Sequence, residues 1–125
     1  MRPNDHINGL FRAFSDPLRL RILRLLQQGE ICVGDLVEVL GVPQPTASRH
    51  LRYLRDAELV DVRKTGRWVF YSLAEPAPGF HSKLLDCLGT CFDEVPELED
   101  DSRRLIALKE SGRGCCVELE CQAPH

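Results

Sequence analysis

The sequence lacks any long hydrophobic run. Nowhere in its 125 residues does an apolar stretch approach the ~18 residues that a membrane span needs. The first residues, MRPNDHING, also lack the apolar region of a signal peptide. With 43% hydrophobic and 28% charged residues, the composition is typical of one globular domain. We therefore expect a cytoplasmic protein without a membrane partner.

Motifs for catalysis are absent as well. The chain has no C-x-x-C redox pair, nucleophile elbow, phosphate-binding loop or pair of catalytic carboxylates. The acidic run 97–101 is interpreted as the solvated start of a helix. A thiol-transfer activity through Cys87 and Cys91 would need a thiolate of low pKa and an anion pocket, for which the sequence gives no argument. We expect no enzyme.

A strong positive charge is also missing, since the formal net charge is −3. The charge is unevenly distributed. Residues 1–73 carry 11 Lys+Arg against 8 Asp+Glu, a net +3, whereas residues 74–125 carry 5 against 11, a net −6. A basic front half and an acidic back half fit a front half that binds nucleic acid and a C-terminal part that faces away from the phosphates.

The hydrophobic periodicity predicts a mainly helical protein. Helices are expected over 5–14, 18–28, 33–40, 44–56, 78–95 and 97–109. Residues 59–64 and 67–73 change to a strand pattern, with a turn at Thr65 and Gly66 between them, and predict a β-hairpin. Two helices joined by a short turn with a glycine form a helix-turn-helix, and the hairpin that follows is a wing.

The helix expected over 44–56 has one apolar and one polar face. Ala47, Leu51 and Leu54 form the apolar stripe. The side chains that point away from it are Gln44, Ser48, Arg49, Arg52 and Arg55. Such a helix can pack on its own domain while it reads base edges and phosphates in the major groove. An ordinary helix with a solvated face would show the same pattern.

Basic residues also surround the tip of the expected wing. They are Arg63, Lys64 and Arg67. Positive charge at the wing tip suits contacts with the minor groove or with flanking phosphates. The alternative interpretation is that these residues form a solvated turn without a DNA contact.

Two segments carry a resemblance to a known family. SDPLRLRILRLL and ICVGDLVEVLGVPQPTASRHLRYLRDAELVDVRKTGRWVFYSL resemble the ArsR/SmtB family of winged-helix repressors, over roughly residues 7–92. The S-x-H-L-x-x-L pattern from Ser48 to Leu54 is the most specific part. The resemblance implies a dimer that leaves its operator DNA when an inducer binds. It implies that the DNA contacts are made by Gln44, Thr46, Ser48, Arg49, His50 and Arg52, together with Arg63, Lys64 and Arg67. His50 also flanks the core stripe, so a structural role for this histidine stays open.

The resemblance also implies how the dimer forms. In the family, the C-terminal helix pairs with its symmetry mate and with the first helix, which would cover Phe80, Leu84 and Leu88. Two recognition helices about 34 Å apart then read successive major grooves. We expect a mainly α fold with a small β-hairpin, a winged helix-turn-helix that forms a homodimer through its terminal helices. Residues 1–95 are expected to form the DNA-binding and dimerisation domain and residues 96–125 a C-terminal helix and cysteine-containing tail. We expect DNA binding to require no cofactor.

Five of the six cysteines lie in the last 39 residues: Cys87, Cys91, Cys115, Cys116 and Cys121. A reducing compartment disfavours a disulfide framework, so the cluster indicates a thiolate function. One arsenic-sensing subgroup of the family uses C-x-C-x-x-C before the recognition helix, but here the positions hold Cys32, Gly34 and Val37. Cys32 alone is interpreted as a small core residue. Zinc-sensing members use Asp and His pairs on the C-terminal helix, where His81 and Asp86 lack a second histidine in register.

Thiolates select soft metals, and trivalent arsenic or antimony prefers three sulfurs. We expect As(III) or Sb(III) as the inducer, bound by Cys91, Cys115 and Cys116, with Cys87 and Cys121 as alternatives. A Cys-Cys pair near the C-terminus is also similar to that of some arsenic-responsive family members. Cadmium, lead or zinc as inducer, thiol oxidation or a persulfide as signal, and cysteines without a sensing role stay open. The alternative to a ligand role for Cys87 and Cys91 is that both are core residues buried at the dimer face.

Overall fold

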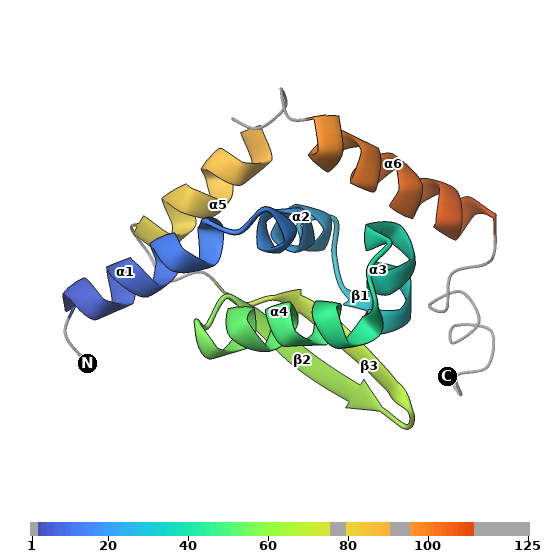
Figure 1. Cartoon of the computed structure of the whole chain (residues 1–125), viewed down its shortest axis with the longest axis horizontal. Coiled ribbons are helices and arrows are strands. Elements are labelled where there is room, and N and C mark those ends of the chain that lie inside the picture. The colour runs from blue at the N-terminus through green and yellow to red at the C-terminus, as the bar shows by residue number, and fades with distance from the viewer. Residues whose placement is uncertain (1–2, 76–79, 91–95, 112–125) are drawn as a thin grey trace.

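The computed structural model describes residues 3–75, 80–90 and 96–111 (Figure 1). Its helices are α1 (Pro3–Phe14), α2 (Pro17–Leu26), α3 (Val33–Leu40), α4 (Gln44–Asp56), α5 (Phe80–Thr90) and α6 (Pro96–Glu110). Its strands are β1 (Ile31–Cys32), β2 (Val60–Thr65) and β3 (Trp68–Leu73). The expected mainly helical fold with a small sheet is confirmed. None of the described helices has the length and hydrophobicity of a membrane span.

The start of α2 is fixed by a capping aspartate. The Oδ1 atom of Asp16 accepts hydrogen bonds from the backbone N–H groups of Leu18 (2.8 Å) and Arg19 (3.1 Å), and Pro17 occupies the first turn. Burial by itself raises the pKa of the Asp16 carboxyl. The backbone hydrogen bonds from Arg19 and Leu18 and the charges of His50 and Arg19 outweigh burial, so the pKa lies below its ordinary value.

The turn between α3 and α4 is the three-residue segment 41–43. Gly41 caps α3 with a left-handed φ of 68°, and its N–H donates to the carbonyl of Val37. Pro43 is extended and precedes the first turn of α4. The helix-turn-helix therefore forms as the sequence predicts, because glycine allows the left-handed cap and proline ends the turn.

The sheet is antiparallel, with the strand order β1-β3-β2. Thr65 pairs with Trp68, so Gly66 and Arg67 form a two-residue turn, one position later than the sequence suggested. Gly66 has a φ of 59°, as a hairpin turn with glycine first requires. The strand β1 cannot be predicted from the sequence, because two residues are too few to show an alternating pattern.

The core is built around α2. Leucine and isoleucine side chains of α2 and of the five helices packed on it form one cluster. Its fully buried members include Leu10, Ile22, Leu25, Ile31, Leu36, Leu51, Leu54, Leu59, Leu88 and Leu105. The core thus connects the helix-turn-helix to α1, α5 and α6.

The last helix, α6, packs on α2 and α3 and closes the core on that side (Figure 1). Leu98, Leu105 and Leu108 are buried on its inner face, whereas Ile106 is 48% exposed. Asp101 lies on this same inner face and is 1% exposed. The interpretation of residues 97–101 as a solvated helix start is therefore wrong for Asp101, because the spacing 98, 101, 105, 108 places this carboxylate on the buried stripe.

Candidate nucleic-acid interface

The helix α4 presents two different faces. Ala47, Leu51 and Leu54 are each 0% exposed and anchor the helix on the core. The side chains of Gln44, Arg49, Arg52 and Arg55 are exposed, and those of Thr46 and Ser48 are half-buried. The outer face therefore carries several cations and hydrogen-bonding groups and is held rigidly by the inner face.

The wing lies on the same side of the molecule as α4. Figure 1 shows α4 and the hairpin β2–β3 together below the core, with α5 and α6 above it. Direct packing of α4 on β2 joins the two elements. The basic recognition surface, which we define as the exposed residues of α4 and the wing tip, thus faces away from the acidic C-terminal helix α6. This arrangement agrees with the charge division of the sequence.

Arg19 of α2 holds α4 in place from behind. Its Nη1 lies 3.4 Å from Nδ1 of His50, and its guanidinium lies 4.0 Å from the centre of the Tyr53 ring. The same side chain donates to the carbonyls of Ala13 (3.0 Å) and Arg12 (2.8 Å) at the end of α1. One arginine therefore links three helices.

His50 points back toward α2. Its side chain is 14% exposed, and Nδ1 lies 4.0 Å from Oδ1 of Asp16. These contacts are those expected if His50 has a structural role. A DNA contact by His50 stays a prediction, and the exposed α4 side chains are better placed for one.

The three wing cations differ in their surroundings. Arg63 donates to both carboxylate oxygens of Glu30 (3.0 and 2.6 Å) and to the hydroxyl of Thr65 (2.7 Å). Its guanidinium also lies 4.5 Å from the centre of the Phe70 ring. Hydrogen bonds from Arg63 lower the pKa of the Glu30 carboxyl. Arg63 therefore already has a bidentate partner within the protein.

Lys64 and Arg67 lie nearer the tip and are exposed. Arg67 stands over the ring of Trp68, with 5.3 Å between its guanidinium carbon and the ring centre. Stacking limits the conformations of this long side chain, so its charge stays close to the turn.

The arginines of α2 are covered by neighbouring helices. The side chains of Arg19, Arg21 and Arg24 are all half-buried and hydrogen-bonded. Arg24 donates to the carbonyl of Leu88 on α5 (3.3 Å), and Arg21 pairs with Asp101 on α6. Helical spacing shows that these arginines lie outside the apolar stripe but cannot show which helices cover them.

Two of the cysteines fall in the described parts of the chain. Cys87 is half-buried on α5. Cys32 is 1% exposed and is therefore a core residue, as expected, but its sulfur also forms a disulfide bond. The other predicted thiol ligands lie outside the described residues: Cys91, Cys115, Cys116 and Cys121. Among the residues that the structure describes, no three His, Cys, Asp or Glu side chains are grouped to hold a metal ion.

Taken with the fold, the two-faced helix and the basic wing define a winged helix-turn-helix DNA-binding protein. Residues 16–62 match the family described as bacterial regulatory protein, arsR family. The arsenical resistance operon repressor of Escherichia coli is 42% identical over 86 residues, which cover 68% of this chain and 74% of that protein. The chain belongs to the ArsR family of DNA-binding transcriptional repressors, which are not enzymes.

Other family members are similar to a comparable degree. The transcriptional repressor SdpR of Bacillus subtilis is 39% identical over 67 residues, covering 54% of this chain and 74% of SdpR. A solved structure, the homodimeric winged helix-turn-helix domain Mb0332 of Mycobacterium bovis, superposes with a TM-score of 0.61 at 30% identity. The superposition covers 73% of this chain and 82% of the Mb0332 chain. Because repressors with different names match about equally well, family similarity by itself does not identify the inducer.

Proposed function

We propose that this protein binds its operator as a homodimer and leaves it when trivalent arsenic or antimony binds cysteine thiolates. The observation that carries the DNA part is the exposed polar face of α4 beside the wing. Gln44, at the start of α4, is proposed to read base edges, together with Thr46 and Ser48. Arg49, Arg52, Lys64 and Arg67 supply charge for phosphates or bases. Arg63 is proposed as a further DNA contact of the wing, with Glu30 as its bidentate partner in the protein.

The exposed apolar side chains of α1 support a homodimer. Ile7 is 38% and Phe11 54% exposed, although Leu10 and Ala13 of the same helix are buried. Both α1 and α5 pack on α2, and we propose that a second copy covers these two helices. Two copies would place two recognition helices on one face of DNA, about 34 Å apart.

The inducer part rests on thiol chemistry. Cys87 is half-buried on α5, and the remaining thiols of the cluster follow it in the sequence. We propose Cys91, Cys115 and Cys116 as the ligands of As(III) or Sb(III), with Cys87 and Cys121 as alternatives. A softer divalent ion such as cadmium, lead or zinc remains the alternative inducer. Binding releases DNA only if the inducer prefers the dimer geometry that fits the operator less well.

A second candidate signal is thiol oxidation. The disulfide of Cys32 favours it, since this sulfur lies where β1 meets α3 and so directly precedes the helix-turn-helix. Forming or breaking that bond would act on the position of α3. Oxidation would then change operator affinity without any metalloid.

The test is fluorescence anisotropy on DNA from the protein's own upstream region. The reduced dimer is titrated with arsenite, antimonite, cadmium and zinc, and separately with an oxidant, for wild type and for the Cys115→Ser/Cys116→Ser variant. Release by arsenite or antimonite in the wild type alone supports the proposed site. Release of both proteins moves the site toward Cys87 and Cys91. Release by the oxidant alone favours the redox alternative, and release by none contradicts the inducer part.

A further inference from the structure

Three charged side chains meet where α2, α3 and α6 come together. Arg21 of α2 donates to both carboxylate oxygens of Asp101 on α6, through Nε (2.7 Å) and Nη2 (2.9 Å). Nη1 of Arg104, also on α6, lies 3.9 Å from Oδ1 of Asp101. Asp101 is 1% exposed and the side chain of Arg21 20%. We call these three residues the α6 clamp.

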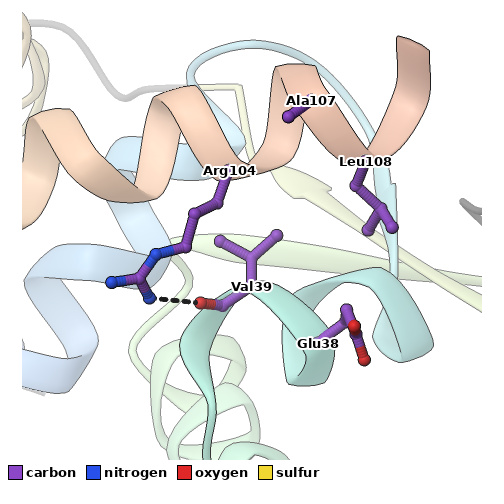
Figure 2. Close-up of a pocket in the computed structure, with 5 residues that line it drawn as sticks. All are labelled: Glu38, Val39, Arg104, Ala107 and Leu108. Atoms are coloured by element: carbon purple, nitrogen blue, oxygen red, sulfur yellow. Dashed lines mark hydrogen bonds between the residues drawn. The ribbon is translucent and has the colours of Figure 1, made fainter. Parts of the chain in front are cut away.

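Both arginines of the α6 clamp also reach the C-terminal end of α3. Nη2 of Arg21 donates to the carbonyl of Leu40 (3.2 Å), and Nη1 of Arg104 donates to the carbonyl of Val39 (3.1 Å). Figure 2 shows the second bond, beside a cavity of about 200 Å³ between α3 and α6. The last carbonyls of a helix have no partner within the helix, and cations are favourable there. The clamp therefore caps α3 with side chains from two other helices.

The capped end of α3 is also the start of the turn to the recognition helix. Gly41 follows Leu40 directly, and α4 begins at Gln44. Only three residues separate the clamped carbonyls from α4, so the direction of the last turn of α3 sets the direction in which α4 leaves the turn. The carbonyl bonds fix that direction from outside the helix-turn-helix.

A buried ion pair is a poor choice if α6 needs only to be attached. Leu98, Leu105 and Leu108 already bury apolar surface against α2 and α3, and an apolar residue at position 101 would hold the helix as well. A bidentate pair adds a fixed relative orientation. The hydrogen bond with Asp101 raises the pKa of Arg21, so this side chain stays charged under all ordinary conditions.

We propose that Arg21, Asp101 and Arg104 are positioning residues that orient the recognition helix for the operator, and that α6 couples the C-terminal thiols to that orientation. The coupling rests on the proposed function. Cys115 and Cys116 follow Glu110, the last residue of α6, by five and six positions. An inducer that draws these thiols together would act on the helix that carries the clamp.

The positioning role is tested without any inducer. Full-length Asp101→Asn is compared with Asp100→Asn, a matched control whose carboxylate is 51% exposed and has only a 4.0 Å contact with Arg103. Anisotropy measures the dissociation constants for operator DNA and for scrambled DNA, and urea unfolding verifies that each variant is folded. We expect Asp101→Asn to weaken operator binding about tenfold, a typical coupling effect. Binding to scrambled DNA should not change, since the basic recognition surface is intact.

A second pair of variants guards against failure of Asp101→Asn to fold. Arg104 is 57% exposed, so its truncation leaves the core intact. Arg104→Ala should weaken operator binding severalfold, and Arg104→Lys, which keeps a cationic donor, should restore most of it. Folded variants that bind the operator like Asp100→Asn would overturn the positioning role. So would equal losses on both DNAs, because these indicate partial unfolding.

The coupling is tested by the fold-change in operator affinity that arsenite causes. In the wild type this factor should be large, and in Arg104→Ala it should fall toward one. An unchanged factor would overturn the coupling through α6. If arsenite does not release even the wild type, the proposed inducer fails, but the inducer-free comparison still decides the positioning role.

Discussion

Two adjacent residues of α4 should respond to truncation in opposite ways. Leu51 is 0% exposed in the core, whereas Arg52 is exposed on the outer face. A buried Leu→Ala substitution costs about 2–5 kcal/mol, because transfer free energy is lost and a cavity remains. Taking ~3 kcal/mol and a urea m-value of ~2 kcal/mol/M, Leu51→Ala should lower the unfolding midpoint by ~1.5 M without a change in m. Arg52→Ala should change stability by at most ~0.5 kcal/mol.

DNA binding should show the reverse. Arg52→Ala should weaken operator binding and reduce the slope of log affinity against log salt by about one, because one phosphate contact is lost. Folded Leu51→Ala should keep the wild-type slope. All proteins are compared at one concentration, since dimer stability depends on it. If Arg52→Ala unfolded as readily as Leu51→Ala, or if Leu51→Ala cost less than ~1 kcal/mol, the orientation of α4 would be wrong.

Local features of the chain give three further predictions. Asp16→Ala should lower the free energy of unfolding by ~1 kcal/mol through loss of the α2 cap, and Asp16→Asn should cost less, because an asparagine amide oxygen can also cap. The carboxylate's extra stabilisation is present at neutral pH and lost only as the pH falls through its lowered pKa, which stability measured against pH will show. Glu58 follows α4 with a φ of 63°, a left-handed conformation that glycine adopts without strain. Glu58→Gly should therefore raise the free energy of unfolding by ~1 kcal/mol, and a decrease would contradict strain at this position. Glu30→Gln should change stability by at most ~0.5 kcal/mol, because its ion pair with Arg63 is exposed, and it should remove a small loss of stability in acid that the wild type shows.

Much of the fold could be predicted from the sequence, because its signals are local. Gly41 and the proline at 43 mark the turn of the helix-turn-helix, and the apolar stripe of Ala47, Leu51 and Leu54 orients α4. The expected bounds of α3 and α4 agree with the structure. Even the outer face of α4 follows directly from the helical period.

The contacts between distant segments could not be predicted in this way. Arg21 and Asp101 are 80 residues apart, and only the packing of α6 on α2 brings them together. The pairing of Arg63 with Glu30 was not predicted either, because Glu30 lies 33 residues away and across the sheet, and the DNA contact of Arg63 stays a prediction. The one local signal that was overlooked is the stripe on α6, which includes a carboxylate among leucines. The domain boundary between residues 95 and 96 stays a prediction.

The most direct test of the central claim is whether the outer face of α4 reads the operator sequence. The affinities of wild type and Gln44→Ala for operator and for scrambled DNA are measured over a range of salt concentrations. Loss of a base contact should cost about 1–3 kcal/mol on the operator alone and leave the salt slope unchanged. Equal weakening on both DNAs, or no weakening on either, would contradict a recognition helix that enters the major groove at Gln44.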